Sequence, residues 1–288
     1  EIGKVLAETL HAELIRLLVE RRSAFAMFGG VRFGGTLTPE DAWWMGFDHI
    51  ALCVGAGGPT VLDIPNGLAR GVRAASDFLM ALQLTGAAKP DSIANMQLRL
   101  PVVVIGGGLT AIDTATESLA YYVVQVEKFL QRFEVLAQEI GEDAIRDSWD
   151  DYEREIAEEF LAHARAIRQE RKQAKSAGRE PRIAEMLRHW GGVTIAYRRR
   201  LVDSPSYTLN HEEVEKALEE GIWFAEGMTP VGVDVDHYGA ARGIRLKNTD
   251  TGTEHWFPAR TVFVAAGTQP NTVLARELGG VGEGFSQA

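Results

Sequence analysis

Cysteine is nearly absent from this chain, since Cys53 is the single one among 288 residues. One cysteine excludes an internal disulfide and a Cys-x-x-Cys redox pair, and it leaves no cysteine cluster to ligate an iron–sulfur centre. Cys53 lies in the apolar run of residues 49–54. We expect a buried, unreactive thiol there.

Positively charged residues are also relatively few, because 30 Lys and Arg stand against 40 Asp and Glu, which gives a net charge of −10. That balance argues against a nucleic-acid surface, because such binding depends on a basic face that neutralises phosphates. No apolar stretch reaches membrane-spanning length and no signal peptide opens the chain, so we expect no membrane contact and a cytoplasmic location. The first residue is Glu1 rather than methionine, which suggests a fragment of a longer protein. The oligomeric state is left open.

Side chains that would form a metal site or a covalent nucleophile are lacking as well. The seven histidines are scattered without ligand spacing, and no arrangement of serine, cysteine and histidine indicates nucleophilic catalysis. We therefore expect no metal and no catalytic residue. The chemistry available to this chain is the binding and orientation of a cofactor.

The most informative passage present is residues 102–113. Four β-branched residues, Val102–Ile105, predict a buried parallel strand, and a glycine turn and an apolar-periodic helix follow directly. This strand–turn–helix context indicates a dinucleotide site. The predicted binding residues around the turn are Gly106, Gly107, Gly108, Leu109, Thr110, Ala111 and Asp113.

Each small residue of this turn has an expected role. Gly106 permits the turn, Gly108 lets the backbone approach a pyrophosphate, and Ala111 lets the helix pack closely on the strand. The N–H groups at the helix start would face the anion. Asp113 has two interpretations that stay open: it positions the nicotinamide, or it is a first-turn carboxylate favoured by the helix dipole.

A second predicted strand, Val193–Tyr197, ends in three consecutive arginines. At this place an acidic residue selects NAD, whereas arginine accepts the 2′-phosphate of NADP. Tyr197, Arg198 and Arg199 are therefore predicted binding residues for NADP(H). The alternative is a solvated basic run, because the glycine turn and the arginines are separated by far more than the usual ~20 residues.

The rest of the pattern predicts an α/β fold, a Rossmann-like parallel sheet with a small antiparallel β meander and an inserted antiparallel helical hairpin. The expected elements are helices at 2–19, 75–84 and 212–220, strands at 24–28, 222–225 and 261–266, and a meander through 231–235, 244–246 and 256. Asn210 and Glu213 have the spacing of a capping box.

The hairpin is expected at 121–188, with a short turn after Gly141 between two apolar seams. Two uses stay open for it. Its helices are solvated and buried only against each other, or they form a docking arm for a partner.

Four segments together resemble one family: residues 103–113, 196–199, 215–221 and 265–271. They are similar to the NADPH-binding half of the glutamate synthase small-subunit type of FAD-dependent pyridine nucleotide oxidoreductase. Residues 47–57, 64–65 and 77–79 resemble that family's crossing from flavin domain to NADPH domain. The resemblance implies that NADPH gives a hydride to FAD and that electrons pass on through iron–sulfur clusters to a partner subunit.

The resemblance also implies roles for single residues. Gly106, Gly108, Ala111, Arg198 and Arg199 would bind the cofactor, and Gly267 would lie at the turn back toward the flavin domain. Ala266 and Gly267 are also predicted cofactor-binding residues. The family's amino-terminal glycine fingerprint, its later glycine–aspartate segment and its cysteine cluster are missing from this sequence. Leu109 stands where the family often has a polar residue, and the helical hairpin is extra.

We therefore expect three parts: residues 1–60 as a remnant of a split FAD domain, 61–271 as the NADPH-binding domain with the insertion 121–188, and 272–288 as a connection toward the missing FAD domain. FAD and an electron-accepting subunit would come with the full-length parent, and the isolated chain is expected to turn over little. Two alternatives stay open. One is a diaphorase or electron-bifurcating subunit of a soluble complex, and the other is a non-catalytic nucleotide-binding scaffold whose hairpin docks a partner.

Overall fold

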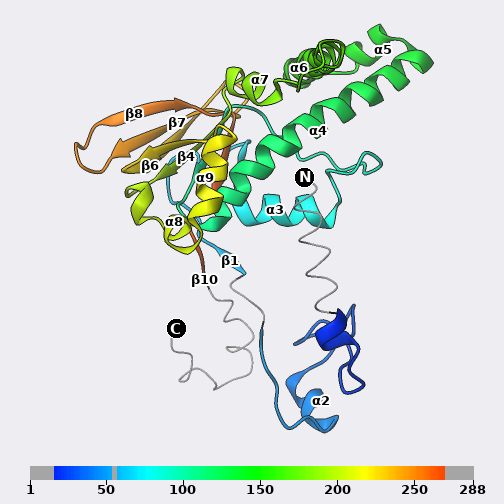
Figure 1. Cartoon of the computed structure of the whole chain (residues 1–288), viewed down its shortest axis with the longest axis vertical. Coiled ribbons are helices and arrows are strands. Elements are labelled where there is room, and N and C mark those ends of the chain that lie inside the picture. The colour runs from blue at the N-terminus through cyan, green and yellow to red at the C-terminus, as the bar shows by residue number, and fades with distance from the viewer. Residues whose placement is uncertain (1–15, 54–56, 270–288) are drawn as a thin grey trace. The chain divides into compact units, whose positions relative to one another are not determined.

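The structure, a computed structural model, describes residues 16–53 and 57–269 (Figure 1). The chain divides into two compact units, one of residues 1–55 and 271–288 and the other of residues 56–270. The second unit contains a five-stranded sheet in the order β2-β9-β3-β4-β5, and all of its neighbouring strands are parallel. Its strands are β2 (Val72–Ala74), β3 (Val102–Ile105), β4 (Val193–Tyr197), β5 (Trp223–Glu226) and β9 (Thr261–Val264). The expected parallel α/β sheet is confirmed.

The sheet is buried on both faces because successive side chains of a strand point to opposite sides. Along β3, Val102 and Val104 belong to a core shared with the helices, whereas Val103 and Ile105 belong to a second core. The second core is covered by the antiparallel strands β6 (Met228–Val235), β7 (Ala241–Asn248) and β8 (Glu254–Pro258). These strands are the predicted meander.

Helices cover the first core. They are α3 (Ala75–Leu84), α4 (Leu109–Ile140), α5 (Glu142–Asp147), α6 (Asp151–Ser176), α7 (Ile183–His189) and α9 (His211–Glu219). α4 runs without a break from the glycine turn, and α5 occupies the place where a short turn was expected after Gly141. In Figure 1 α4 lies across the view and α6 is seen nearly end-on, so the two long helices cross steeply.

The two long helices are not buried only against each other, and that expectation was wrong. Tyr122 on α4 and Phe160 on α6 form an edge-to-face pair with ring centroids 6.1 Å apart. Both side chains belong to the same buried cluster as Val104 of the sheet. The apolar seams were visible in the sequence, but a seam shows that a face is buried and not which surface buries it.

After β4 the chain forms a 3-10 turn (Leu201–Asp203) and the helices α8 (Pro205–Leu209) and α9 (His211–Glu219). α9 confirms the helix expected at 212–220, and Gly221 ends it with φ +88°. The expected capping box does not form. Asn210 also ends α8, where its N–H donates to the Ser206 carbonyl (2.8 Å), and its side chain donates directly to Glu213 (2.7 Å).

The described part of the first unit holds a single π-helical turn (Arg16–Glu20) and α2 (Pro39–Trp44), which begins with a capping box of Thr38 and Asp41. Residues 2–15 of the expected first helix lie outside the described residues. The strand expected at 24–28 was wrong, because no described strand pairs with this segment. Cys53 is exposed rather than buried, since the described residues 49–53 form no strand that other layers could cover.

No helix among residues 16–53 and 57–269 is both long and apolar enough to cross a membrane. Two short strands complete the second unit, β1 (Gly58–Pro59) and β10 (Thr268–Gln269), which pair antiparallel. They bring the segment before the parallel sheet beside the segment after it (Figure 1).

Candidate functional site

The glycine turn between β3 and α4 starts at a position that only glycine fits. Gly106 has φ +152°, and a Cβ there would collide with the carbonyl oxygen of Ala265. Its N–H donates to the Ala196 carbonyl (3.0 Å), and the N–H of Ala265 donates to the Ile105 carbonyl (2.7 Å). The turn is therefore held between the ends of β4 and β9.

The next two glycines face different surroundings. A Cβ at Gly107 would run into the ring of Tyr197, whereas a Cβ at Gly108 would meet nothing within 4 Å. Gly107 also accepts a hydrogen bond from the N–H of Ser206 (3.0 Å). The outer side of the turn is thus open at Gly108 and closed by side chains at Gly107.

The open side of the turn carries free donors. Gly108 is the N-cap of the 32-residue helix α4 and provides no side-chain cap. In the described part of the chain, no acceptor takes the N–H groups of Gly108, Leu109 and Thr110. Unpaired N–H groups at the positive end of a long helix form a ready anion site.

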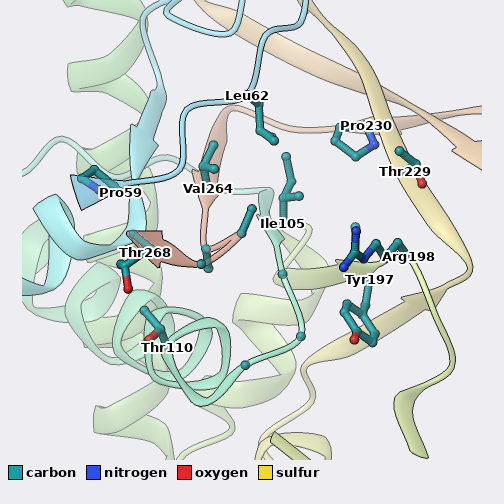
Figure 2. A pocket seen from close by; sticks show the side chains of 18 of the residues that line it. Pro59, Leu62, Ile105, Thr110, Tyr197, Arg198, Thr229, Pro230, Val264 and Thr268 are labelled. Atoms are coloured by element: carbon teal, nitrogen blue, oxygen red, sulfur yellow. The ribbon is translucent and has the colours of Figure 1, made fainter. Parts of the chain in front are cut away.

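A cleft of about 560 Å³ opens beside this turn, at the carboxyl ends of β3, β4 and β9. Eight predicted site residues line it: Gly106, Gly107, Gly108, Thr110, Tyr197, Arg198, Ala266 and Gly267. Figure 2 shows Arg198 beside Tyr197, with its side chain pointing toward Ile105 at the end of β3. Thr110 and Thr268 lie on the other side of the turn.

Four predicted site residues do not line the cleft. Ala111 is fully buried behind the turn, in the helix-packing place expected for it. Leu109 is the first residue of α4, and Asp113 is exposed on its first turn. Arg199 is exposed next to Arg198 at the end of β4.

The three arginines after β4 differ in their partners. Arg200 pairs with Asp203 (2.8 Å), and its hydrogen bond holds the pKa of that carboxyl below the usual value. Arg198 and Arg199 make no hydrogen bond or ion pair through their side chains to any residue of 16–53 or 57–269. The guanidinium of Arg198 therefore remains available in the cleft wall.

Several lining residues were missed in the sequence: Pro59, Leu62, Asp63, Ser76, Pro205, Met228, Thr229 and Pro230. Ser76 directly precedes the segment 77–79 that carried part of the family resemblance, so a signal existed for it. Thr229 and Pro230 come from the meander. Nothing in an alternating strand pattern marks the residues that border a distant turn.

The residues present fit the pyrophosphate of a dinucleotide, because backbone donors are open at Gly108 and a Cβ at Gly107 or Gly106 would disturb the turn. A second strand–glycine turn–helix unit, of the kind that binds FAD, does not occur among the described residues. The same residues contain no cluster of His, Cys, Asp or Glu able to hold a metal ion.

Comparison with known proteins gives relatives of much greater length. The chain is 41% identical over 249 residues to an uncharacterized protein of Rickettsia prowazekii, covering 86% of this chain and 32% of that protein. It is 30% identical over 96 residues to the small chain of NADPH glutamate synthase of Escherichia coli, covering 28% of this chain and 20% of that one. The chain thus spans about a third or less of the curated relatives it matches.

Among solved structures, thioredoxin reductase of Lactococcus lactis matches with a TM-score of 0.39 and 17% identity, over 76% of this chain and 45% of that one. The model of the pyridine nucleotide-disulphide oxidoreductase family matches residues 35–282, which is most of the sequence. That family implies FAD and a nicotinamide nucleotide. This chain belongs to the pyridine nucleotide-disulphide oxidoreductase family.

Proposed function

We propose that residues 61–271 bind NADPH and present its nicotinamide to a flavin within a longer protein similar to the glutamate synthase small chain. NADPH, when bound, would supply a hydride, and the flavin that would accept it would be held by other parts of the longer protein. The work of this chain is positional, because holding two reactants in line is itself a large part of such catalysis. The similarity to the Escherichia coli small chain supports the proposal over 96 residues.

One observation carries the choice of NADPH over NADH. Arg198 lines the cleft at the end of β4, the strand beside the glycine turn, and no carboxylate of the described residues pairs with it. No acidic residue occurs between the strand and Asp203. A guanidinium fork matches the oxygens of a phosphomonoester, which is what distinguishes the ribose of NADPH.

The other predicted residues take their roles around this contact. The turn from Gly106 to Thr110 would receive the pyrophosphate, and Arg199 would add a second charge near the 2′-phosphate. Ala266 and Gly267 would border the nicotinamide end of the cleft. Asp113 does not line the cleft, and both of its interpretations, positioning the nicotinamide or stabilising the helix start, stay open. Residues 1–60 would be a remnant of the first half of a split FAD domain and residues 272–288 a connection toward the missing FAD domain, so FAD and an electron-accepting subunit would enter with the rest of the parent protein.

Calorimetric titration of NADPH and NADH against matched variants tests the proposal. Arg198→Gln should weaken NADPH binding about 10- to 100-fold, the value of one charge-assisted hydrogen bond of roughly 1.5–3 kcal/mol, and Arg199→Gln should do so to a smaller degree. NADH affinity should stay nearly constant. Arg242→Gln, on an exposed arginine of β7, is the control. Equal affinity of the unaltered chain for both nucleotides would contradict the proposal.

A further inference from the structure

A second cavity, of about 300 Å³, lies at the opposite end of the parallel sheet from the cleft. It is bordered by the residues that lead into β2, β3 and β9, whereas the cleft lies where β3, β4 and β9 end. In Figure 1 the two ends of the sheet can be located by two labelled helices. α7 precedes β4 and marks the end with this cavity, and α8 follows β4 and marks the end with the cleft. The four charged residues that line this cavity are Arg70, Arg73, Arg99 and Arg260.

Two of these arginines already have carboxylate partners. Arg99, only 5% exposed, donates to Glu159 (2.6 Å) and to Glu155 (3.0 Å) on α6. Arg260 donates to the same Glu155 (2.7 Å). The two arginines hold the pKa of Glu155 below its usual value. Two positive charges are thus balanced by two negative ones, and they fix α6 to the edge of the sheet.

The other two arginines are not balanced. Arg73, half-buried in the middle of β2, makes no side-chain hydrogen bond or ion pair within the part of the chain that the structure describes. Arg70 lies with its guanidinium 5.5 Å from the centre of the Tyr152 ring, and no described carboxylate comes within 4 Å of it. The cavity therefore keeps two uncompensated positive charges beside a compensated pair.

The backbone fixes these groups around the cavity. Gly71 has φ +91°, and a Cβ there would lie 2.6 Å from the carbonyl oxygen of Arg260. Only glycine permits this close approach, which places Arg70 and Arg73 on either side of it next to Arg260. The carbonyl of Arg70 is held by the N–H of Ala241 (2.8 Å). The backbone positions from which these arginines reach the cavity are thus fixed relative to one another, whereas the Arg70 side chain itself is exposed.

We propose that this cavity is an anion site for a small phosphate-bearing molecule. Like charges gathered in a partly desolvated place repel one another, and a bound dianion would replace that repulsion with attraction. Guanidinium groups bind phosphate oxygens in a fork geometry that suits this ligand class. The volume, at the lower limit of ligand pockets, fits inorganic phosphate or a small phosphorylated metabolite.

Inorganic phosphate and glycerol phosphate, titrated separately into the whole chain, test the site. The amide NMR signals of Gly71 and Ala241 report on the cavity, and the signal of Gly108 reports on the cleft. We expect saturable shifts at Gly71 and Ala241, and the probe that binds more tightly identifies free phosphate or a phosphomonoester as the better ligand. Arg73→Gln should weaken that binding about tenfold or more, whereas the control Arg242→Gln should not change it.

The cleft beside Gly108 could also bind phosphate, so the experiment must distinguish binding in the cleft from binding in the second cavity. Arg198→Gln should leave the shifts at Gly71 and Ala241 unchanged, whatever its effect at Gly108. If Arg73→Gln does not fold, Arg73→Lys takes its place. It retains the charge but lacks the guanidinium fork, so phosphate binding should weaken there to a smaller degree. Absence of saturable shifts at Gly71 and Ala241 in the unaltered chain, or their survival at full strength in Arg73→Gln, overturns the proposal.

Discussion

The ring of Tyr197 occupies the space that a side chain at Gly107 would need. Tyr197 ends β4 and Gly107 lies in the turn after β3, and these two strands are parallel neighbours. The strand end that carries the arginines is therefore packed directly against the turn that would hold the pyrophosphate. The two parts of the predicted dinucleotide site are joined by a side-chain contact as well as by the sheet.

Replacement of Gly107 by alanine should destabilise the fold. The added methyl group would overlap the Tyr197 ring, and overpacking of this kind costs about 1–3 kcal/mol. The free energy of unfolding, measured by urea titration, gives the effect. Tyr197→Ala in the same chain should recover part of the loss, because it removes the atoms that clash. Unchanged stability of the single variant would show that the ring moves aside without cost.

Replacement of Gly108 by alanine should leave the stability of the fold almost unchanged and should weaken nucleotide binding. Its φ of −91° suits any residue, and a Cβ would meet nothing within 4 Å, so stability should change by less than about 0.5 kcal/mol. Nucleotide binding should weaken, because the methyl group would stand on the open side of the turn that the pyrophosphate approaches. Calorimetry with NADPH measures this loss. Undiminished affinity would place the pyrophosphate elsewhere.

The sequence predicted those parts of the fold that are specified by local pattern. β3 is a run of four buried β-branched residues, α9 ends at the glycine Gly221, and the meander strands alternate apolar with other residues. Each of these elements could therefore be predicted from its own sequence. β2 could not be found this way, since three residues with a central arginine carry no period. Its place in the sheet is decided by pairing with β9, which lies far away in the sequence.

The site shows the same division. The glycines, Tyr197 and Arg198 were predicted because strand ends of a parallel sheet meet at one edge. The burial of Arg99 had no signal, because an arginine is buried only where partners such as Glu155 and Glu159 reach it from a distant helix. The exposure of Cys53 likewise depended on which layers cover a segment, not on the apolar residues beside it.

A partly buried pair between α4 and α6 makes stability depend on pH. The Tyr122 hydroxyl lies 2.6 Å from Nδ1 of His163, whose ring stacks on Trp190 with centroids 3.7 Å apart. Burial lowers the pKa of His163, partly opposed by Glu159. The unfolded chain therefore binds more protons below about pH 6.5, so this contribution is present above that pH and is lost as pH falls.

Tyr122→Phe tests the pair, because it removes the hydroxyl that shares a hydrogen bond with Nδ1 of His163, and a hydroxyl that donates to this nitrogen favours the neutral ring. The pKa of His163 should move toward its usual value, and stability near pH 8 should fall by about 1 kcal/mol. NMR titration of the histidine signals and urea unfolding measure the two effects. Tyr207→Phe, on a partly exposed tyrosine whose hydroxyl makes no hydrogen bond in the described chain, is the control. An unmoved His163 titration in Tyr122→Phe would mean that the hydroxyl does not favour the neutral ring.

The end of α6 is expected to contribute to acid sensitivity. Glu170 accepts hydrogen bonds from the side chain of Arg179 and from the N–H of Arg182 (2.8 Å), which lower its pKa from 4.5 to about 2. Because the folded pKa lies below the unfolded one, this contribution is complete above about pH 4.5 and is lost as pH falls toward 2.

Glu170→Gln should therefore lose less stability than the unaltered chain between about pH 5 and pH 3. Glu139→Gln, on an exposed glutamate of α4 without an ion pair in the described residues, should follow the unaltered chain. Parallel urea midpoints for Glu170→Gln and the unaltered chain across this range would show that the carboxylate is not held in solution as it is in the structure.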